Sequence, residues 1–367
     1  MTNTTAPTVS WLAYCRAGFE PDLVAEFTSK FGATPVATRA EPSSGYVLAT
    51  FAQKNAKRGT TLADWRDWIF ARQMLRANAE PIALKTNDRV TPIVAAAKAW
   101  LAQQKVTKLS ALWVEYPDTN DGKELSKLSQ ALQLRIGGEL IACGLLQKEN
   151  ETAPRLHVFL TPQREAFLAL ADPAKASTWP LGIARLKMPR DAPSRSTLKL
   201  AEALHLFVGG NEERILRPEM RAVDLGAAPG GWTWQLIHRG LHVTAIDNGT
   251  LKGELVDNAL VRHLREDGFR YRPKRAVDWM VCDMVEQPVR IAQLVAMWFR
   301  EGWTERCIFN LKLPMKKRLE EVRKCHAIIE EALQMSGRDY ELRIKQLYHD
   351  REEVTGFCRF VPRSERE

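Results

Sequence analysis

The chain has 367 residues, of which 45% are apolar and 26% charged, and its net charge is +9. This length allows two or three domains with buried cores, and this composition excludes a disordered or fibrous protein. No apolar run is long enough to cross a membrane, and the first residues lack the pattern of a signal peptide. We therefore expect a cytoplasmic protein that does not enter a membrane.

The excess of positive charge has two interpretations. A basic surface suits a polyanionic partner, because each neutralised phosphate releases counterions. A solvated basic surface without such a partner has the same composition. The six cysteines are scattered, with no C-x-x-C pair and no Cys/His cluster at zinc spacing. We therefore expect reduced cysteines and no metal site.

Hydrophobic spacing predicts two small α+β parts before residue 171, at 1–80 and 81–170. In chain order we expect a strand at 10–16, a helix at 21–31, a strand at 45–51, a helix marked by Trp65, Trp68, Ile69 and Met74, a helix at 92–103, a strand at 111–116, a helix at 124–143 and a strand at 155–160.

Four prolines interrupt residues 171–193, which predicts a linker there. Trp179 and nearby apolar residues indicate that this linker packs against the protein. From 194 to 367 strands and helices alternate, which is typical of an α/β chain with a doubly wound sheet. We expect strands at 221–225, 243–247, 279–283, 307–312, 342–347 and 356–361, and helices from an N-cap at Ser196 to Phe207 and at 231–239, 289–301 and 317–335. The short connection between the last two strands predicts an antiparallel hairpin.

A glycine-rich turn follows the first of these strands, in the segment Asp-Leu-Gly-Ala-Ala-Pro-Gly-Gly-Trp at 224–232. Its glycines allow close backbone approach at the polarised start of a helix. Asp247 ends the next strand and is placed to bind ribose hydroxyls. The dinucleotide spacing G-x-G-x-x-G is absent, which favours S-adenosylmethionine (SAM) over NAD. A plain strand-to-helix turn is the other interpretation. The candidate cofactor residues are Ser196, Gly226, Ala228, Pro229, Gly230, Gly231, Trp232, Asp247, Asp267 and Asp283.

Asp267 is the most ambiguous of these residues. It follows a probable third strand and could contact the adenine amine of SAM, but Asp267-Gly268 is also typical of a surface turn. Cys282 precedes Asp283 and lacks the following proline that marks a pyrimidine C5 methyltransferase, so we interpret it as a packed strand residue. The Asn/Asp-Pro-Pro-Tyr/Phe motif of amine-directed methyltransferases is also absent at 282–285.

Polar residues at strand ends suggest a catalytic site. Asp283 and Lys312 end two neighbouring strands, and ligands of open α/β sheets bind at the carboxyl ends of strands. Lys199 lies on the helix before the first strand, and Glu353 lies near the start of the last one. Each residue alone is more often a surface or salt-bridge residue, and the combination is what points to catalysis.

Four segments of the chain resemble the FtsJ-type ribose 2′-O-methyltransferases. They are residues 194–200, 224–232 and 282–284, and the strand that ends at Lys312. The resemblance implies a Lys-Asp-Lys-Glu tetrad at Lys199, Asp283, Lys312 and Glu353, with Glu352 as the alternative fourth residue. Segments 15–20 and 70–73 resemble the ferredoxin-like part that precedes a THUMP domain, and 114–120 resembles THUMP itself. The implied architecture is a ferredoxin-like subdomain at 1–80, an RNA-binding THUMP domain at 81–170, a linker at 171–193 and a Rossmann-like methyltransferase domain at 194–367.

The resemblance further implies the reaction, which is SAM-dependent 2′-O-methylation of one cytidine in 23S ribosomal RNA. Independently of the resemblance, we expect a monomer. Lys312 would act as general base, because burial and the positive charge of Lys199 favour its neutral form. The basic cluster at 316–318 would contact RNA. The alternatives are a methyltransferase acting on another RNA or on a small molecule, and an RNA-binding module without turnover.

Overall fold

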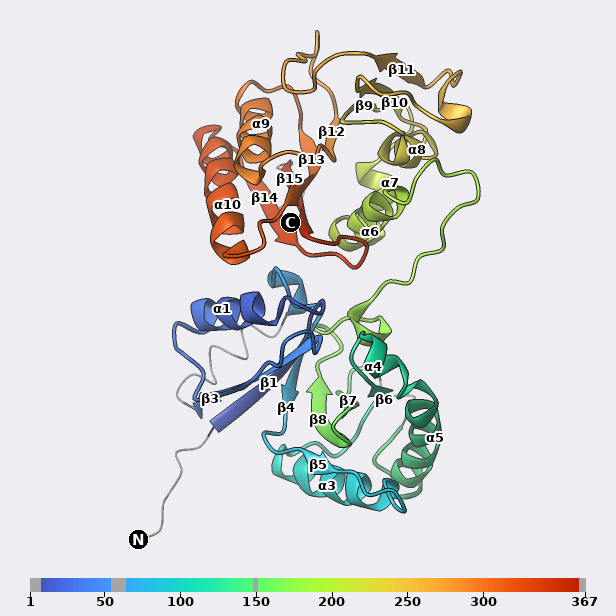
Figure 1. Cartoon of the computed structure of the whole chain (residues 1–367), viewed down its shortest axis with the longest axis vertical. Coiled ribbons are helices and arrows are strands. Elements are labelled where there is room, and N and C mark those ends of the chain that lie inside the picture. Colours follow the sequence, from blue (N-terminus) through green and yellow to red (C-terminus); the bar gives the residue numbers. More distant parts are fainter. Residues whose placement is uncertain (1–7, 54–63, 148–150, 363–367) are drawn as a thin grey trace. The chain divides into compact units, whose positions relative to one another are not determined.

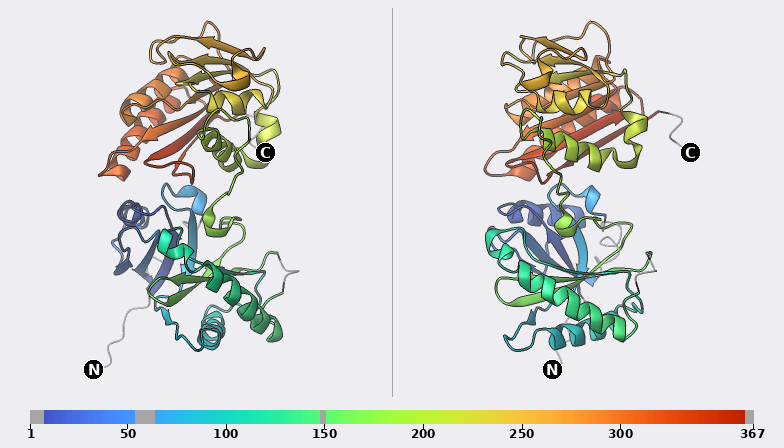
Figure 2. Two further views of the ribbon diagram at one scale, coloured as in Figure 1. Left: turned by 45° about the vertical axis from the view of Figure 1, so that its right-hand side comes forward. Right: turned by 90° about the vertical axis from the view of Figure 1, so that its right-hand side faces the viewer.

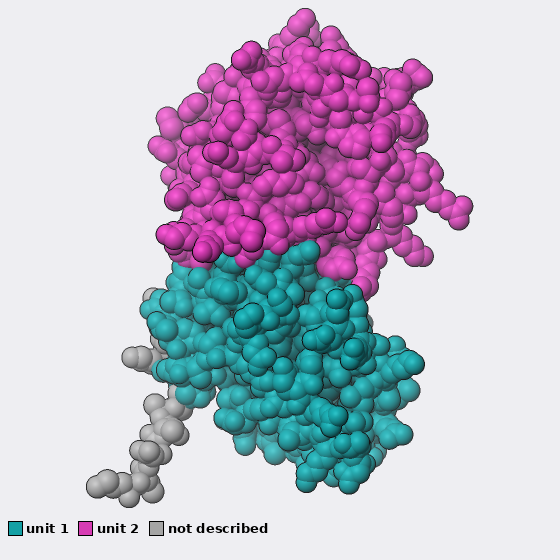
Figure 3. Space-filling view, in the orientation of Figure 1, with its two compact units in different colours: residues 1–183 teal, residues 184–367 magenta. Residues whose placement is uncertain are grey.

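The computed structural model describes residues 8–53, 64–147 and 151–362, and the chain divides into two compact units, residues 1–183 and 184–367 (Figures 1 and 3). Each unit is built on a sheet of its own. The predicted α/β class and the Rossmann-like sheet of the second unit are confirmed.

Unit 1 contains one eight-stranded sheet in the order β2-β3-β1-β4-β8-β7-β6, with β5 paired to β8. The pairing of β4 with β8 joins the segments predicted as 1–80 and 81–170 into this sheet. Its strands are β1 (Thr8–Tyr14), β2 (Ala37–Arg39), β3 (Tyr46–Ala52), β4 (Gln73–Ala77), β5 (Ile82–Ala83), β6 (Leu112–Glu115), β7 (Arg155–Thr161) and β8 (Glu165–Ala171), and its helices are α1 (Glu20–Phe31), α3 (Val90–Gln103), α4 (Asn120–Lys123) and α5 (Ser126–Ala142).

The helix predicted from Trp65 to Met74 is wrong. A short 3₁₀ turn, Trp65–Asp67, is followed by extended chain and then by β4. The carboxylate of Glu26 on α1 accepts hydrogen bonds from the backbone N–H groups of Ile69 (2.6 Å) and Phe70 (3.0 Å). These donors therefore bond to a side chain on another element, which a helical spacing of apolar residues does not reveal.

The first half of the predicted linker packs on unit 1. The N–H of Ser177 donates to the side chain of Gln73 at 2.9 Å, and the N–H of Leu181 donates to Glu115 at 2.6 Å. Trp179 meets Trp65 edge to face. Buried contacts therefore fix this proline-containing segment as far as the end of the unit at Ile183.

Unit 2 contains a seven-stranded sheet in the order β11-β10-β9-β12-β13-β15-β14. Neighbouring strands are parallel from β11 to β13, and β15 runs antiparallel to both β13 and β14, which confirms the predicted hairpin. The strands are β9 (Arg221–Leu225), β10 (His242–Ile246), β11 (Val261–Leu264), β12 (Trp279–Cys282), β13 (Arg306–Lys312), β14 (Tyr340–Lys345) and β15 (Glu353–Phe360).

Helices cover both faces of this sheet (Figures 1 and 2). Helices α9 and α10 pack side by side, and α6 packs against α8. Phe207 of α6 stacks on Phe357 of β15 at 5.6 Å, which fixes α6 over the antiparallel end of the sheet. The helices are α6 (Thr197–Phe207), α7 (Glu212–Ile215), α8 (Gly231–Ile237), α9 (Pro288–Arg300) and α10 (Arg318–Met335).

Ser196 occupies the N-cap position of α6, as predicted, but its side chain does not cap the helix. The Ser196 hydroxyl instead pairs with the Ser194 hydroxyl at 2.7 Å. The backbone carbonyl of Ser196 accepts a hydrogen bond from the indole N–H of Trp232 at 3.1 Å. Ser196 therefore connects the start of α6 to the glycine-rich turn.

Candidate active site

Four charged side chains of unit 2 meet at one edge of the sheet. The Nζ atom of Lys199 lies 3.3 Å from Oδ2 of Asp283 and 2.6 Å from Oε1 of Glu353. The Nζ atom of Lys312 pairs with Oε2 of Glu353 and lies 3.6 Å from Oδ1 of Asp283. The structure therefore brings together the four residues predicted as catalytic, with each lysine between two carboxylates.

The register of two strands creates half of this cluster. Lys312 of β13 lies directly opposite Glu353 of β15, and Asn310 lies opposite Thr355. Side chains two residues apart share one face of a strand, so both pairs face the same side of the sheet. Phe357, two residues beyond Thr355, packs on α6 on that side. Lys199 reaches the cluster from the first turn of α6.

The choice between Glu352 and Glu353 follows from burial. Glu353 is 4% exposed and bonds to both lysines. Glu352 is exposed, and its carboxylate pairs with Arg318 at 2.8 Å. The geometry therefore places Glu353, and not Glu352, in the cluster.

The electrostatics of the cluster hold two groups in their charged forms. Burial alone would lower the pKa of Lys199, but the carboxylates of Asp283 and Glu353 raise it above its usual value. Burial alone would raise the pKa of Glu353, but Lys199 and Lys312 lower it below its usual value. Lys199 is therefore a cation and Glu353 an anion at neutral pH.

A pocket of about 260 Å³ opens beside the cluster. Asp283 and Lys312 line it together with the backbone of the glycine-rich turn. The pocket thus joins the predicted cofactor loop to two predicted catalytic residues. Its lining residues are Ser194, Ser196, Gly226, Ala227, Ala228, Pro229, Trp232, Asp283, Val285 and Lys312.

The glycines of this turn are required by space. Gly226 has a φ of +78°, and a Cβ atom there would lie 2.6 Å from the side chain of Met284. A Cβ atom on Gly231 would lie 2.2 Å from the Ser196 hydroxyl and 2.8 Å from the backbone nitrogen of Thr197. Such distances are far below van der Waals contact, so the turn keeps its shape only with glycine at these positions.

Asp247 and Asp267 lie outside the residues that line the pocket. Both oxygens of Asp247 accept backbone N–H groups, from Ala228 at 3.0 Å and from Gly249 at 2.7 Å. Asp247 therefore stabilises the glycine-rich turn through these backbone hydrogen bonds. Asp267 is exposed and accepts the N–H of Phe269 at 2.8 Å, as in a surface turn. Their predicted contacts with ribose and adenine stay predictions.

Three family models match the chain. They describe the RlmM ferredoxin-like domain at residues 9–75, the N-terminal part of ribosomal RNA large subunit methyltransferase M at 88–172, and an FtsJ-like methyltransferase at 192–356. Proteins named ribosomal RNA large subunit methyltransferase M from Thauera aminoaromatica and Methylococcus capsulatus are each 48% identical to this chain. The matches cover 94% and 96% of this chain and 94% and 98% of those proteins.

The chain belongs to the ribosomal RNA large subunit methyltransferase M family. The resemblance to FtsJ-type enzymes is thereby confirmed, and the FtsJ-like match includes all four residues of the charged cluster. The THUMP assignment of 81–170 stays a prediction. Among solved structures, TrmN from Thermus thermophilus matches 96% of this chain with a TM-score of 0.36 and 16% identity, which is too low to support an inference.

Asp224 begins the glycine-rich segment and is buried, but it is not among the predicted site residues. One of its oxygens accepts the hydroxyl of Thr233 at 2.6 Å, and the other has no hydrogen-bond partner among the described residues. Burial raises the pKa of Asp224 from 3.8 to about 7, and the nearby charges of Asp283 and Asp247 contribute. The sequence feature that could have identified Asp224 is an acid near the end of an apolar strand, directly before the glycine-rich turn.

Cys282 is fully buried in β12, as expected of a packed strand residue, and burial raises the pKa of its thiol. This environment does not suit a nucleophile, because the thiolate is the reactive form. Among the described residues, no cluster of three or more His, Cys, Asp or Glu side chains could hold a metal ion. No helix in that part of the chain combines the length and apolar character needed to span a bilayer.

The basic cluster at 316–318 is partly neutralised. Lys317 pairs with Glu320, and Arg318 pairs with Glu352. A larger group of cations surrounds a groove of about 600 Å³ along β9, β10 and β11. One carboxylate, Glu266, lines the same groove. The groove's charged basic side chains are Arg221, Arg262, Arg272, Lys274 and Arg275.

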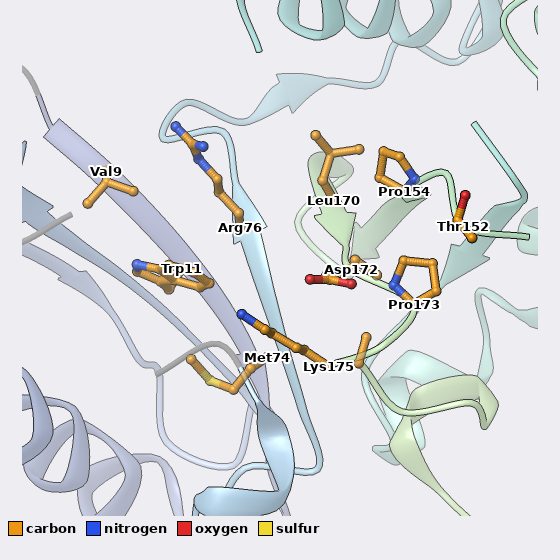
Figure 4. Close-up of a pocket in the computed structure, with 12 residues that line it drawn as sticks. Val9, Trp11, Met74, Arg76, Thr152, Pro154, Leu170, Asp172, Pro173 and Lys175 are labelled. Atoms are coloured by element: carbon orange, nitrogen blue, oxygen red, sulfur yellow. The ribbon is translucent and has the colours of Figure 1, made fainter. Parts of the chain in front are cut away.

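Unit 1 has a pocket of its own, of about 440 Å³, beside β1, β4 and β8 (Figure 4). Trp11, Arg76, Leu170 and Asp172 are among the residues that line it. None of the residues predicted from the sequence as catalytic or cofactor-binding lies there. The charged cluster of unit 2 is therefore the candidate active site.

Proposed function

We propose that this chain transfers a methyl group from SAM to the ribose 2′-hydroxyl of a cytidine in 23S ribosomal RNA. Family membership supports a ribosomal RNA methyltransferase, since the relatives carry that name. The observation that carries the proposal is the closed cluster of Lys199, Asp283, Lys312 and Glu353, which borders the pocket of the glycine-rich turn.

The pocket beside the turn suits SAM. SAM supplies an electrophilic methyl group bound to a positively charged sulfur. The carboxylate of Asp283 lines the pocket and complements that charge. The hydroxyls of Ser194 and Ser196 and the close backbone of 226–229 supply polar contacts for the rest of the molecule. Asp247 and Asp267 would contact its ribose and adenine.

Lys312 would be the general base of the reaction. Lys312 belongs both to the cluster and to the lining of the pocket, so it would lie beside a hydroxyl that approaches the methyl group. The 2′-oxygen would form a bond to the methyl carbon that SAM supplies as the carbon–sulfur bond breaks, and Nζ of Lys312 would accept the hydroxyl proton. Lys199 keeps its positive charge, because the carboxylates of Asp283 and Glu353 raise its pKa.

The remaining cluster residues would position the reactants. Glu353 holds both lysines at once, and Asp283 faces both of them. Alignment of nucleophile and methyl group accounts for much of the acceleration in such a reaction. The basic groove along β9 to β11 is the surface that we expect to hold RNA phosphates. An rRNA substrate would place the enzyme in the cytoplasm, and we expect it to act as a monomer.

A methyl-transfer assay with nucleoside analysis tests this function. The protein is incubated with tritiated SAM and 23S rRNA that lacks the modification, and the RNA is digested to nucleosides. We expect label in 2′-O-methylcytidine. Label on a base, on another RNA or on a small molecule from a cell extract would contradict the proposal, and so would binding of RNA without any transfer.

A further inference from the structure

Two large apolar side chains are exposed beside the catalytic cluster. Val285 is 87% exposed and Met315 is 84% exposed, which are the highest values among the large apolar residues that the structure describes. Val285 lies two positions after Asp283, and Met315 lies three positions after Lys312. The strands that precede them, β12 and β13, are parallel neighbours in the sheet (Figure 1). Both residues therefore lie at the edge of the sheet that carries the cluster.

The loop that carries Val285 is fixed on both sides of this residue. Met284 packs against the glycine-rich turn, since a Cβ atom on Gly226 would lie 2.6 Å from its side chain. On the other side, Glu286 pairs with Arg290 of α9. Val285 stands between these contacts and lines the pocket of the glycine-rich turn. Its side chain is therefore held in solvent by a loop with defined contacts.

The loop that carries Met315 is fixed in the same way. The backbone N–H of Leu313 donates to the carbonyl of Glu352 at 2.8 Å, and Arg318 at the start of α10 pairs with the Glu352 carboxylate at 2.8 Å. Leu313 is buried, whereas Met315 is exposed. Met315 thus lies in a short connection whose two ends both bond to the segment before β15.

The place of these residues, and not their exposure alone, indicates a ligand. Single apolar side chains occur on most protein surfaces and need no partner. The base of a nucleotide, however, is attached to the ribose carbon next to the one that bears the 2′-hydroxyl. A hydroxyl at Lys312 therefore brings its base to the loops that follow β12 and β13. A base has faces on which apolar groups pack, whereas a phosphate has none.

We propose that Val285 and Met315 hold the base of the target nucleotide while its ribose lies at Lys312. This inference rests on the proposed function, because the place of the ribose follows from the role of Lys312. Contact with a base removes apolar surface of both side chains from water, which offsets part of the cost of unstacking that base. Lys316, exposed next to Met315, adds a positive charge for a neighbouring phosphate.

Polar substitutions in the full-length enzyme test this pair. Val285→Ser and Met315→Gln change exposed side chains, so thermal unfolding should stay close to that of wild type. We expect each variant to lower kcat/KM for 23S rRNA about fivefold at an unchanged KM for SAM, because each loses apolar contact with the base. Val285→Ile and Met315→Leu should retain activity. Val36→Ser and Met335→Gln are the matched controls, because both residues are exposed and lie far along the chain from the cluster.

RNA without the target base separates base contact from any other role of the pair. The nucleotide that the wild-type enzyme methylates is mapped first. The 23S rRNA is then assembled with a ribose at that position that keeps its 2′-hydroxyl but has no base, and transfer of tritiated methyl is measured. On ordinary RNA the double variant Val285→Ser/Met315→Gln should lose about twentyfold in kcat/KM. On the RNA without the base it should differ from wild type by less than about twofold, because the partner of both side chains is gone.

Wild-type kcat/KM for ordinary RNA in the double variant would overturn the proposal. Equal losses on RNA with and without the base would also overturn it, because the side chains would then act on another group. A loss confined to KM for SAM would assign Val285 to the cofactor instead. Each of these results can occur in an enzyme that forms 2′-O-methylcytidine, so the proposed function would stand. Absence of ribose methylation by the wild-type enzyme would overturn the proposed function, and this inference with it.

Discussion

Lys199 and Lys312 share one carboxylate. Glu353 binds Lys199 through Oε1 at 2.6 Å and Lys312 through Oε2. The two lysines differ in their surroundings, since the pKa of Lys199 is raised and, of the two, Lys312 lines the pocket of the glycine-rich turn. Lys199 is thus held as a cation beside Lys312, which is the lysine that we propose as the base.

Removing the charge of Lys199 should therefore slow methyl transfer. Lys199→Met takes away the cation that pairs with both Asp283 and Glu353, so these buried carboxylates lose a partner and the geometry of the cluster changes. We expect kcat to fall about tenfold or more at an unchanged KM for SAM. Single-turnover rates measure this loss, and Lys324→Met on α10 is the matched control. A kcat equal to that of wild type would refute the role of Lys199 in the cluster.

The buried Asp224 predicts a stability effect with a defined sign. Between its usual pKa near 4 and its raised value of about 7, the folded state binds more protons than the unfolded state. The stability of wild type therefore falls as the pH rises through this range, by up to about 4 kcal/mol. Asp224→Asn is neutral throughout, so its free energy of unfolding relative to wild type should increase from pH 4 to pH 7 and then level off. Denaturant titrations at several pH values measure it, and a pH-independent difference would exclude the buried carboxyl as the cause.

The glycine turn predicts a steric effect at Gly231. A Cβ atom there would meet Ser196 and the backbone of Thr197, so Gly231→Ala should destabilise the protein by about 1–3 kcal/mol and weaken SAM binding. Gly210→Ala is the matched control, because a Cβ atom at Gly210 has no neighbour within 4 Å. Calorimetric SAM affinity and thermal unfolding report both effects. Unchanged SAM affinity in Gly231→Ala would show that this turn does not shape the cofactor site.

The basic groove predicts how RNA affinity depends on salt. Replacing Arg262, Lys274 and Arg275 by Ala should weaken RNA binding and reduce the slope of log affinity against log salt by about one unit for each phosphate that is no longer neutralised. A Lys316→Ala/Lys317→Ala variant tests the basic cluster named from the sequence, where Lys317 already has a carboxylate partner. Filter-binding titrations at several salt concentrations compare the two. A larger effect at Lys316 and Lys317 would assign the RNA surface to that cluster instead.

The sequence was sufficient to predict those strands and helices that depend on the local pattern of apolar and polar residues. The strands that end at Leu225, Cys282 and Lys312 are apolar runs followed by polar or glycine residues, and the structure confirms them. The segment from Trp65 to Met74 was misassigned because its backbone donors bond to Glu26, a residue about forty positions away in sequence. A pattern of apolar residues contains no information on such a partner.

The candidate site shows the same division. Asp283 and Lys312 could be named because strand ends are where α/β sheets bind ligands. The hydrogen bonds that link Asn310 to Thr355 and Thr355 to Asp350 could not be predicted. They depend on the register of β13 against β15 and on the path of the hairpin. Taken singly, Asn310 is a polar residue in a strand and Asp350 is an acid in a turn.

Substitution of Lys312 tests the central claim most directly. The full-length Lys312→Ala variant is compared with wild type and with Lys324→Ala in transfer of tritiated methyl to unmodified 23S rRNA, followed by nucleoside analysis, and SAM affinity is measured by calorimetry. We expect no 2′-O-methylcytidine from Lys312→Ala, a SAM affinity close to that of wild type, and full activity from Lys324→Ala. Formation of 2′-O-methylcytidine by Lys312→Ala at the wild-type rate would contradict the assignment of Lys312 as the base.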